Sequence, residues 1–204
     1  MRETTSQPMN LGPQETVYQD HVRRIYRKVA EFEGFSKQYL VSDEGERAAV
    51  LVTSGSYVLF ARQYRLLIDN VSLEIPGGRV DAGETPEKAA IRECYEETGV
   101  ECRNLRGLQS YYPGLDVTFN PTYIFHSDDV VPTSVARNAR SLWLPLYVCL
   151  EMISDGKIQD AMTIVALLTY SLDICRGVKI KNKPECGINP VCTHRRNCTV
   201  LKGE

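Results

Sequence analysis

Short apolar runs separated by polar turns fill the first third of the chain. Residues 35–42 and 48–53 look like strands, and residues 57–63 return as another strand after the Ser-Gly-Ser turn at 54–56. We therefore expect an antiparallel hairpin in this region. Residues 17–32 carry apolar positions that fit a helical stripe and a strand equally well, so both remain open.

A helix is expected over residues 87–98. Thr85 is a suitable N-cap, and Pro86 fits the first helical position, where no hydrogen bond is lost with its missing N–H. Gly99 suits the left-handed conformation that ends many helices. The predicted apolar side of this helix contains Ala90, Ile91, Cys94 and Tyr95.

The second half of the chain alternates short strands with two longer apolar segments. Further strands are expected at residues 73–75, 105–112 and 122–126, with a Pro-Gly break at 113–114. The segment 130–141 is expected to be a loop. The length and apolar spacing of helices are found at residues 146–153 and 161–174. This order of elements predicts an α/β or α+β domain.

The composition fits one folded domain. The 204 residues have a mass of 23.0 kDa, 43% of them are apolar and 25% are charged, so the chain can bury a core. We expect a flexible N-terminus at 1–16, the domain at 17–175 and a tail at 176–204. The tail holds seven Lys or Arg and two Glu, a balance of +5, which leaves −7 on the rest of a chain with net charge −2.

Charge and hydropathy exclude several classes of function. A net charge of −2 and a pI near 6.0 do not fit a polycation built for nucleic acid. No run of about 18 apolar residues is present, which argues against a membrane span. Residues 1–20 do not resemble a secretory signal. We expect a cytoplasmic protein with no membrane and no specific nucleic-acid partner.

The seven cysteines fall into two groups. Without a secretory signal, a disulfide framework is not expected. Four cysteines lie among apolar residues and are expected to be core thiols: Cys94, Cys102, Cys149 and Cys175. The tail holds ligands of the zinc type, but their spacing is not the tight C-x2-C form, so a solvated basic tail is favoured over zinc. These tail residues are Cys186, Cys192, His194 and Cys198.

Three glutamates gather on one side of the helix predicted at 87–98. Glu93 and Glu97 are four residues apart and lie on one face, and Glu96 flanks it. Like charges at this spacing repel, and a divalent cation such as Mg²⁺ would offset the repulsion. Arg92 precedes Glu96 by four residues and can hold it in place. An isolated acidic run of this kind is more often a solvated face.

The spacing of residues over the whole segment 78–100 favours a metal site over a solvated acidic face. Residues 78–100 fit G-x5-E-x7-R-E-U-x-E-E-x-G-U, where U is an apolar residue, and Cys94 fills a slot usually held by an aliphatic one. The segment resembles the Nudix box, and the chain is identified as a member of the Nudix hydrolases. The matching residues are Gly78, Glu84, Arg92, Glu93, Cys94, Glu96, Glu97, Gly99 and Val100. The resemblance implies the Nudix fold, a mixed β-sheet sandwiched between helices, here with an N-terminal β region.

Residues outside the box are similar to the ADP-ribose pyrophosphatase branch. They are Gln63-Tyr64-Arg65, the stretch 73–78, Pro113-Gly114 and the stretch 151–161. This resemblance implies hydrolysis of ADP-ribose or a related nucleoside diphosphate sugar to a nucleoside monophosphate and a sugar phosphate. It also implies a homodimer with exchanged N-terminal strands. Two alternatives stay open: a hydrolase of nucleoside triphosphates or dinucleoside polyphosphates, and an inactive nucleotide-binding module.

The family resemblance assigns roles by matching position. Glu93, Glu97 and the Gly77 carbonyl are implied to bind Mg²⁺, for which Mn²⁺ can substitute. Glu96 is implied to be a further metal ligand or to orient the attacking water. Arg92 holds the glutamates, and these four charged residues form the implied catalytic set. Glu84 is implied to organise the loop before the helix.

The residues expected to contact the substrate match the ADP-ribose pyrophosphatase branch less completely than the metal-binding residues do. Arg65 is a candidate phosphate or ribose contact, since its planar fork suits phosphate oxygens. Glu74 is a substrate or dimer contact, or a strand-end charge, and the Pro113-Gly114 break is a further candidate contact. The branch usually has a glutamate in a late loop, but no Glu lies between Leu115 and Leu150. The acids present there are Asp116, Asp128 and Asp129, and one of them can take that place.

Overall fold

The computed structural model describes residues 6–131 and 141–177. Contacts between its residues divide the chain into two compact units. The first unit is Met1–Arg47 with Ser110–Thr122, and the second is Ala48–Gln109 with Tyr123–Glu204. The domain boundaries expected at residues 16 and 175 stay a prediction. The cysteines and the histidine of the tail lie outside the described residues.

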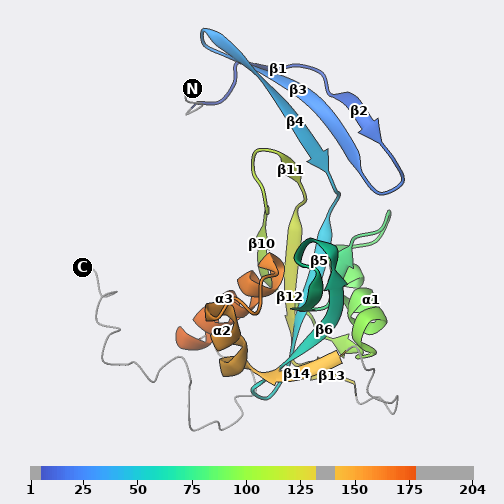
Figure 1. Cartoon of the computed structure of the whole chain (residues 1–204), viewed down its shortest axis with the longest axis vertical. Coiled ribbons are helices and arrows are strands. Elements are labelled where there is room, and N and C mark those ends of the chain that lie inside the picture. The colour runs from blue at the N-terminus through green and yellow to red at the C-terminus, as the bar shows by residue number, and fades with distance from the viewer. Residues whose placement is uncertain (1–5, 132–140, 178–204) are drawn as a thin grey trace, which may run out of the picture. The chain divides into compact units, whose positions relative to one another are not determined.

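The first unit is built on one small sheet (Figure 1). Its strands are β1 (Asn10–Leu11), β2 (Glu15–Gln19), β3 (Arg24–Phe32), β4 (Phe35–Asp43) and β11 (Thr118–Phe119). The long hairpin of β3 and β4 forms its centre, β1 and β2 pair antiparallel with β3, and β11 pairs parallel with β4. The structure thus decides between helix and strand for residues 17–32. Residues 10–16, expected to be loose, contribute β1 and the start of β2.

A tight turn closes the β3–β4 hairpin. Phe32 pairs with Phe35 across the strands, and their rings stack with centroids 4.9 Å apart. Only Glu33 and Gly34 remain for the turn, and Gly34 has a φ of 76°, in the left-handed region that glycine adopts without strain. The hairpin register is therefore fixed by local chemistry.

The second unit contains a larger sheet with the order β10-β12-β5-β6-β14, in which β7 also pairs with β6 and β8 with β5. Most of the expected strands are present, including the hairpin of β5 and β6. Two strands of this sheet were not expected: β8, which begins just after the strand expected at 73–75, and β14. The strands are β5 (Arg47–Ser54), β6 (Tyr57–Arg65), β7 (Asn70–Glu74), β8 (Gly77–Arg79), β10 (Arg106–Tyr111), β12 (Thr122–Ser127) and β14 (Ser141–Pro145). The single-turn helix η1 (Leu66–Ile68) joins β6 to β7, and β9 (Cys102–Arg103) pairs with β13 (Asp129–Val130).

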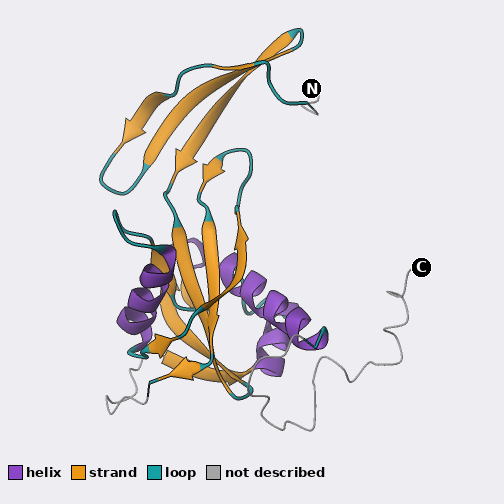
Figure 2. Ribbon diagram, turned by 180° about the vertical axis from the view of Figure 1, so that it is seen from behind, coloured by secondary structure: helices purple, strands orange, loops and turns teal. Residues whose placement is uncertain are grey.

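Helices cover both faces of this larger sheet (Figures 1 and 2). They are α1 (Pro86–Thr98) on one face and α2 (Leu146–Ser154) and α3 (Ala161–Cys175) on the other. Because both faces are covered, residues 48–52 of β5 and 58–61 of β6 are buried without interruption. The expected layer order, a mixed sheet between helices, is confirmed. No helix among the described residues is long and apolar enough to span a membrane.

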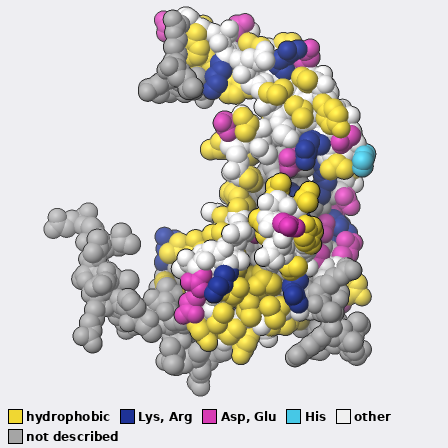
Figure 3. Space-filling model, in the orientation of Figure 1, with side chains coloured by type: hydrophobic (Ala, Val, Ile, Leu, Met, Phe, Trp, Pro, Cys, Tyr) yellow, Lys and Arg dark blue, Asp and Glu magenta, His cyan; other side chains and the backbone are white. Residues whose placement is uncertain are grey.

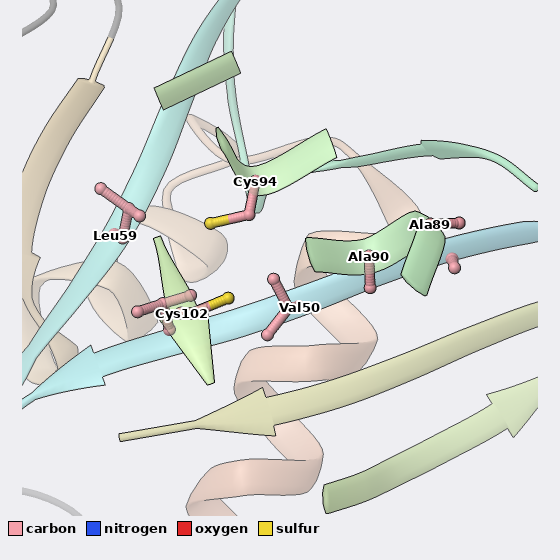
Figure 4. Packing of buried hydrophobic residues seen from close by; sticks show 8 residues of the cluster. Val50, Leu59, Ala89, Ala90, Cys94 and Cys102 are labelled. Carbon is pink, nitrogen blue, oxygen red and sulfur yellow. The ribbon is translucent and has the colours of Figure 1, made fainter. Parts of the chain in front are cut away.

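Small side chains let α1 lie close to the sheet. Ala89, Ala90 and Cys94 of the helix pack with Val50 and Leu59 of the strands, as Figure 4 shows. Two expectations are corrected here. Tyr95, assigned to the apolar side, is 54% exposed, because the buried face runs through Ala89, Ala90, Cys94 and Thr98. Cys175, expected in the core, is exposed, whereas Cys94, Cys102 and Cys149 are buried.

Candidate active site

Local capping fixes the start and end of α1, and with them the positions of its acids. The Thr85 Oγ1 atom accepts a hydrogen bond of 3.3 Å from the N–H of Lys88, and Pro86 occupies the first turn. At the other end Gly99 is left-handed, with a φ of 72°, and its N–H donates to the Tyr95 carbonyl. These features confirm the helix expected from the sequence.

The Gly77-Gly78 pair of β8 brings backbone against both the sheet and the helix. A Cβ atom on Gly77 would lie 2.6 Å from the Ala48 carbonyl oxygen, so only glycine lets β8 approach β5 this closely. A Cβ on Gly78 would lie 2.7 Å from Oε2 of Glu93 and closer still to Oε1. The Glu93 carboxylate therefore rests directly on the Gly78 backbone, in a cradle that any larger residue would fill.

Arg92 is the centre of an ion-pair network on one side of the helix. Its Nε and Nη2 atoms donate to the two oxygens of Glu84, at 3.1 and 2.9 Å, which raises the pKa of Arg92 and lowers that of Glu84. Its Nη1 atom donates to Glu93 at 2.9 Å and to Glu96 at 3.3 Å. The Arg79 carbonyl accepts a further bond of 3.0 Å from Nη2. The loop before the helix and two box glutamates are thus held by one guanidinium.

Glu97 is held differently. Its Oε2 accepts a hydrogen bond of 3.1 Å from the Gly77 N–H, and its Oε1 accepts one from Nε2 of Gln63. Burial raises the pKa of Glu97, and the nearby charges of Glu93 and Glu74 raise it further. A half-buried carboxylate crowded by other carboxylates is a place where an added cation lowers the free energy.

The box acids open onto a pocket of about 430 Å³ within the second unit. Strand β6 forms one wall and the C-terminal half of α1 forms the other. The lining residues are Ala61, Arg62, Gln63, Tyr64, Glu96 and Glu97. Carboxylates on one wall and polar side chains on the other suit a charged, hydrated ligand better than an apolar one.

Arg65 and Glu74, both predicted as substrate contacts, bind each other. The Arg65 Nε atom donates to Glu74 Oε1 at 2.8 Å, and Nη2 pairs with Oε2. The Glu74 side chain is only 8% exposed, so this fork-shaped pair compensates a buried charge. The pair raises the pKa of Arg65, to which the charges of Asp160 and Glu97 also contribute. A substrate role for either residue stays a prediction.

Pro113 and Gly114 belong to the first unit, where Gly114 forms an isolated bridge with Thr118. A pocket of about 220 Å³ lies there, and the ring centroids of Tyr112 and Phe119, two of its lining residues, are 6.5 Å apart. A substrate role for the Pro-Gly break also stays a prediction. The pocket is lined by Tyr26, Val41, Tyr112, Gly114, Leu115, Asp116, Val117, Thr118 and Phe119.

The aspartates of the late segment have partners of their own. Asp128 forms an ion pair of 3.6 Å with Arg106, and Asp129 accepts a hydrogen bond of 2.5 Å from Asn104. Asp116 lines the pocket of the first unit. Within the larger pocket the lining acids are Glu96 and Glu97 of the box.

The glutamates expected to bind metal lie close together on α1, but their carboxylates accept hydrogen bonds from other residues of the protein. Among residues 6–131 and 141–177, no three His, Cys, Asp or Glu side chains converge into a preformed metal cluster. Arg92 holds Glu93 and Glu96, while Gly77 and Gln63 hold Glu97. The oxygen donors nevertheless fit a hard divalent cation, and the Glu93 carboxylate lies in the Gly78 cradle beside them.

Sequence reasoning gave no role to two residues that the structure brings to this region. Gln63 was noted only as part of the Gln-Tyr-Arg match, yet its side chain contacts Glu97. Thr163 is fully buried in α3; its hydroxyl accepts the Ile75 N–H at 2.9 Å and donates to Asp160 at 2.6 Å. For Gln63 the sequence did hold a signal: it lies two residues before Arg65 on a strand, so the two side chains share one face of the sheet.

Comparisons with known proteins bear on the family and on the fold. A NUDIX domain model matches residues 43–145. The chain is 31% identical to a CMP-5'-(N-acetyl-N-hydroxy-3-aminopropyl)phosphonate hydrolase of Streptomyces rubellomurinus over 65% of this chain, although the match spans only 66% of that relative. It is 26% identical to an ADP-ribose pyrophosphatase of Bacillus subtilis over 65% of this chain and 75% of the relative. The crystal structure of an ADP compounds hydrolase has the same fold, with a TM-score of 0.70 over 86% of this chain and 99% of its own, at 19% identity.

Proposed function

The chain belongs to the NUDIX domain family of hydrolases, and we propose that it hydrolyses the diphosphate bond of ADP-ribose or a related nucleoside diphosphate sugar in the presence of Mg²⁺. Water adds to one phosphorus atom and the bridging P–O bond breaks. The products are a nucleoside monophosphate and a sugar phosphate, and the protons of the attacking water are released as the two new phosphate monoesters ionise.

One observation carries this proposal. Glu93, Glu96 and Glu97 present their carboxylates from one helix beside the glycines of β8, and two of them line a pocket of about 430 Å³. Oxygen donors of this kind bind Mg²⁺, which in turn binds phosphate oxygens. Glu93, Glu97, Glu96 and the Gly77 carbonyl would hold the ion, which when bound neutralises charge on the diphosphate.

The chain's own residues supply the rest of the site. Arg92 fixes Glu93 and Glu96 against repulsion, since its Nη1 atom bonds both. Glu96, 56% exposed at the pocket, would accept a hydrogen bond from the attacking water and hold its proton. Arg65 would meet a phosphate or ribose group from its paired position on Glu74.

The choice of substrate rests on the relatives. Two of them are described as hydrolases of an ADP-ribose and of a CMP compound, and each name joins a nucleotide to an organic group. Each of these matches covers 65% of the present chain. We infer that a nucleoside diphosphate joined to a sugar fits this chain better than a nucleoside triphosphate.

A homodimer is proposed as the working assembly. The small sheet of the first unit has apolar side chains on its surface, as Figure 3 shows, and each of four is more than half exposed: Leu11, Val17, Tyr18 and Leu40. Exposed apolar side chains gathered on a small sheet are typical of a surface that binds another protein. A second copy of the chain would cover it. Light scattering should give twice 23.0 kDa for the protein and a smaller mass for Leu40→Asp.

The substrate proposal is tested with a panel of nucleotides. The purified protein is incubated with Mg²⁺ and ADP-ribose, UDP-glucose, diadenosine tetraphosphate or ATP, and products are separated by ion-exchange chromatography. We expect AMP from ADP-ribose at the highest kcat/KM. A higher kcat/KM for ATP or the dinucleotide would favour the alternative, a hydrolase of nucleoside triphosphates or dinucleoside polyphosphates. Absence of product from every compound would favour an inactive nucleotide-binding module.

A further inference from the structure

We propose that Gln63 is a positioning residue for Glu97, and that its side-chain amide sets the orientation in which the Glu97 carboxylate binds the divalent cation. The inference rests on the proposed function, because it requires the cation site on α1. It concerns a residue of the opposite wall of the pocket, on strand β6.

Glu97 differs from its neighbours in how its charge is supported. Glu93 and Glu96 share the Arg92 guanidinium, at 2.9 and 3.3 Å. The donors to Glu97 are neutral: the Gly77 N–H at 3.1 Å on Oε2 and the Gln63 amide on Oε1. One donor is backbone and the other is a side chain that a substitution can remove.

Strand β6 holds Gln63 in a fixed place. Gln63 pairs with Ser72 of β7, and Ala61 and Arg65, two residues away on either side, pair with Glu74 and Asn70. Directly paired residues share a face of the sheet. The Gln63 side chain therefore leaves the sheet on the same side as the Arg65–Glu74 pair and reaches the Glu97 carboxylate on α1.

The two donors together constrain the Glu97 carboxylate. With one donor on each oxygen, coming from β8 and β6, rotation about the last bond of the side chain would break a hydrogen bond. An ionised carboxylate accepts only, so it is the NH₂ group of Gln63 that faces it. Each oxygen keeps a second lone pair for the cation. Outer partners of this kind typically change metal affinity by about 10–100-fold when they are removed.

The test measures Mn²⁺ binding to the full chain without substrate, from the free-ion signal in electron paramagnetic resonance. Gln63→Met keeps the length of the side chain and removes the donor, and Gln63→Asn keeps an amide that is one methylene too short. We expect Mn²⁺ affinity to fall about 10-fold in the first variant and in the same direction in the second. Gln159→Met, the same substitution at an exposed position, should leave it unchanged.

A double-mutant cycle separates positioning from general damage to the fold. If Gln63 acts through Glu97, Gln63→Met should change Mn²⁺ affinity less than twofold in a Glu97→Gln background. An equal loss in both backgrounds, or unchanged affinity with a raised KM alone, would overturn the inference. Since the readout needs no turnover, inactivity toward ADP-ribose would refute the substrate and leave this result standing. A wild-type chain that binds no Mn²⁺ would refute both.

Discussion

The two glycines of β8, Gly77 and Gly78, allow two adjacent substitutions with opposite consequences. In Gly78→Ala, the new Cβ would lie 2.7 Å from Oε2 of Glu93, where ordinary contacts begin at 3.4 Å. That oxygen must move by at least 0.7 Å, and Oε1 and Cδ, which are closer to the Cβ, must move further. The obstacle is the end of one side chain, so we expect a loss of unfolding free energy of only about 1 kcal/mol.

Activity should respond far more strongly than stability. A misplacement of roughly 1 Å in a catalytic group can reduce the rate about 100-fold, and Glu93 is proposed to bind the cation. In Gly77→Ala the Cβ meets backbone instead, 2.6 Å from the Ala48 carbonyl oxygen and 2.7 Å from the Ala49 Cα. Buried backbone cannot rotate away, so this variant should lose about 3 kcal/mol or more of stability.

The assay pairs thermal melting with kcat/KM for ADP-ribose at saturating Mg²⁺. Gly78→Ala should melt within a few degrees of the wild type and lose about 100-fold in kcat/KM. Gly77→Ala should melt much lower. Gly78→Ala with activity within threefold of the wild type would refute the claim that Glu93 must rest on the Gly78 backbone.

Three further predictions follow from single contacts. Arg92→Lys should lower kcat/KM at least 10-fold, since one ammonium cannot replace the fork that holds Glu84 and the box glutamates; activity equal to the wild type would contradict this. Thr163→Val leaves the Ile75 N–H without its acceptor and should reduce the free energy of unfolding by about 1–3 kcal/mol in urea titrations; an unchanged midpoint would count against it. His126 is 1% exposed, and burial lowers its pKa to about 4. The folded protein therefore favours the neutral imidazole. The stability that this group contributes is fully present above pH 6.5, and roughly 3 kcal/mol of the free energy of unfolding should be lost as the pH falls from 6.5 to 4. His126→Gln should show a weaker dependence over this range, and an equally steep one would assign the effect to other groups.

Features governed by neighbouring residues could be predicted from the sequence. The helix α1 is an example, because Thr85, Pro86 and Gly99 act within one turn of its ends. The hairpin of β5 and β6 is another, because its two apolar runs are neighbours in the sequence and the turn between them is local. The acidic face could also be placed, since residues 93, 96 and 97 must lie together on any helix.

Features that depend on residues distant in the sequence could not be predicted. Strand β8 consists of Gly77, Gly78 and Arg79, which have low strand propensity, and it exists because it pairs with β5. Tyr95 was placed on the wrong side because an apolar residue near the stripe was assumed to be buried, whereas the helix packs through its smaller residues. The contact between Gln63 and Glu97 joins residues 34 apart, and no local pattern fixes it.

The same limit explains the first unit. Residues 10–16 belong to a segment rich in Thr, Gln, Pro and Gly, so they were expected to be loose. They form strands because β3 offers an edge on which β1 and β2 can pair. The apolar residues exposed on this sheet, such as Leu11 and Leu40, form the surface on which the homodimer is proposed to assemble.

The most direct test of the central claim compares two charge removals on one helix. Glu97→Gln changes a carboxylate at the pocket, and Glu87→Gln changes an exposed one in the first turn of α1. Release of AMP from ADP-ribose is measured for both variants and the wild type with Mg²⁺ and with excess EDTA. The account predicts Mg²⁺-dependent release that Glu87→Gln keeps and Glu97→Gln loses by at least 100-fold. Release that survives in Glu97→Gln, or that continues in EDTA, would contradict it.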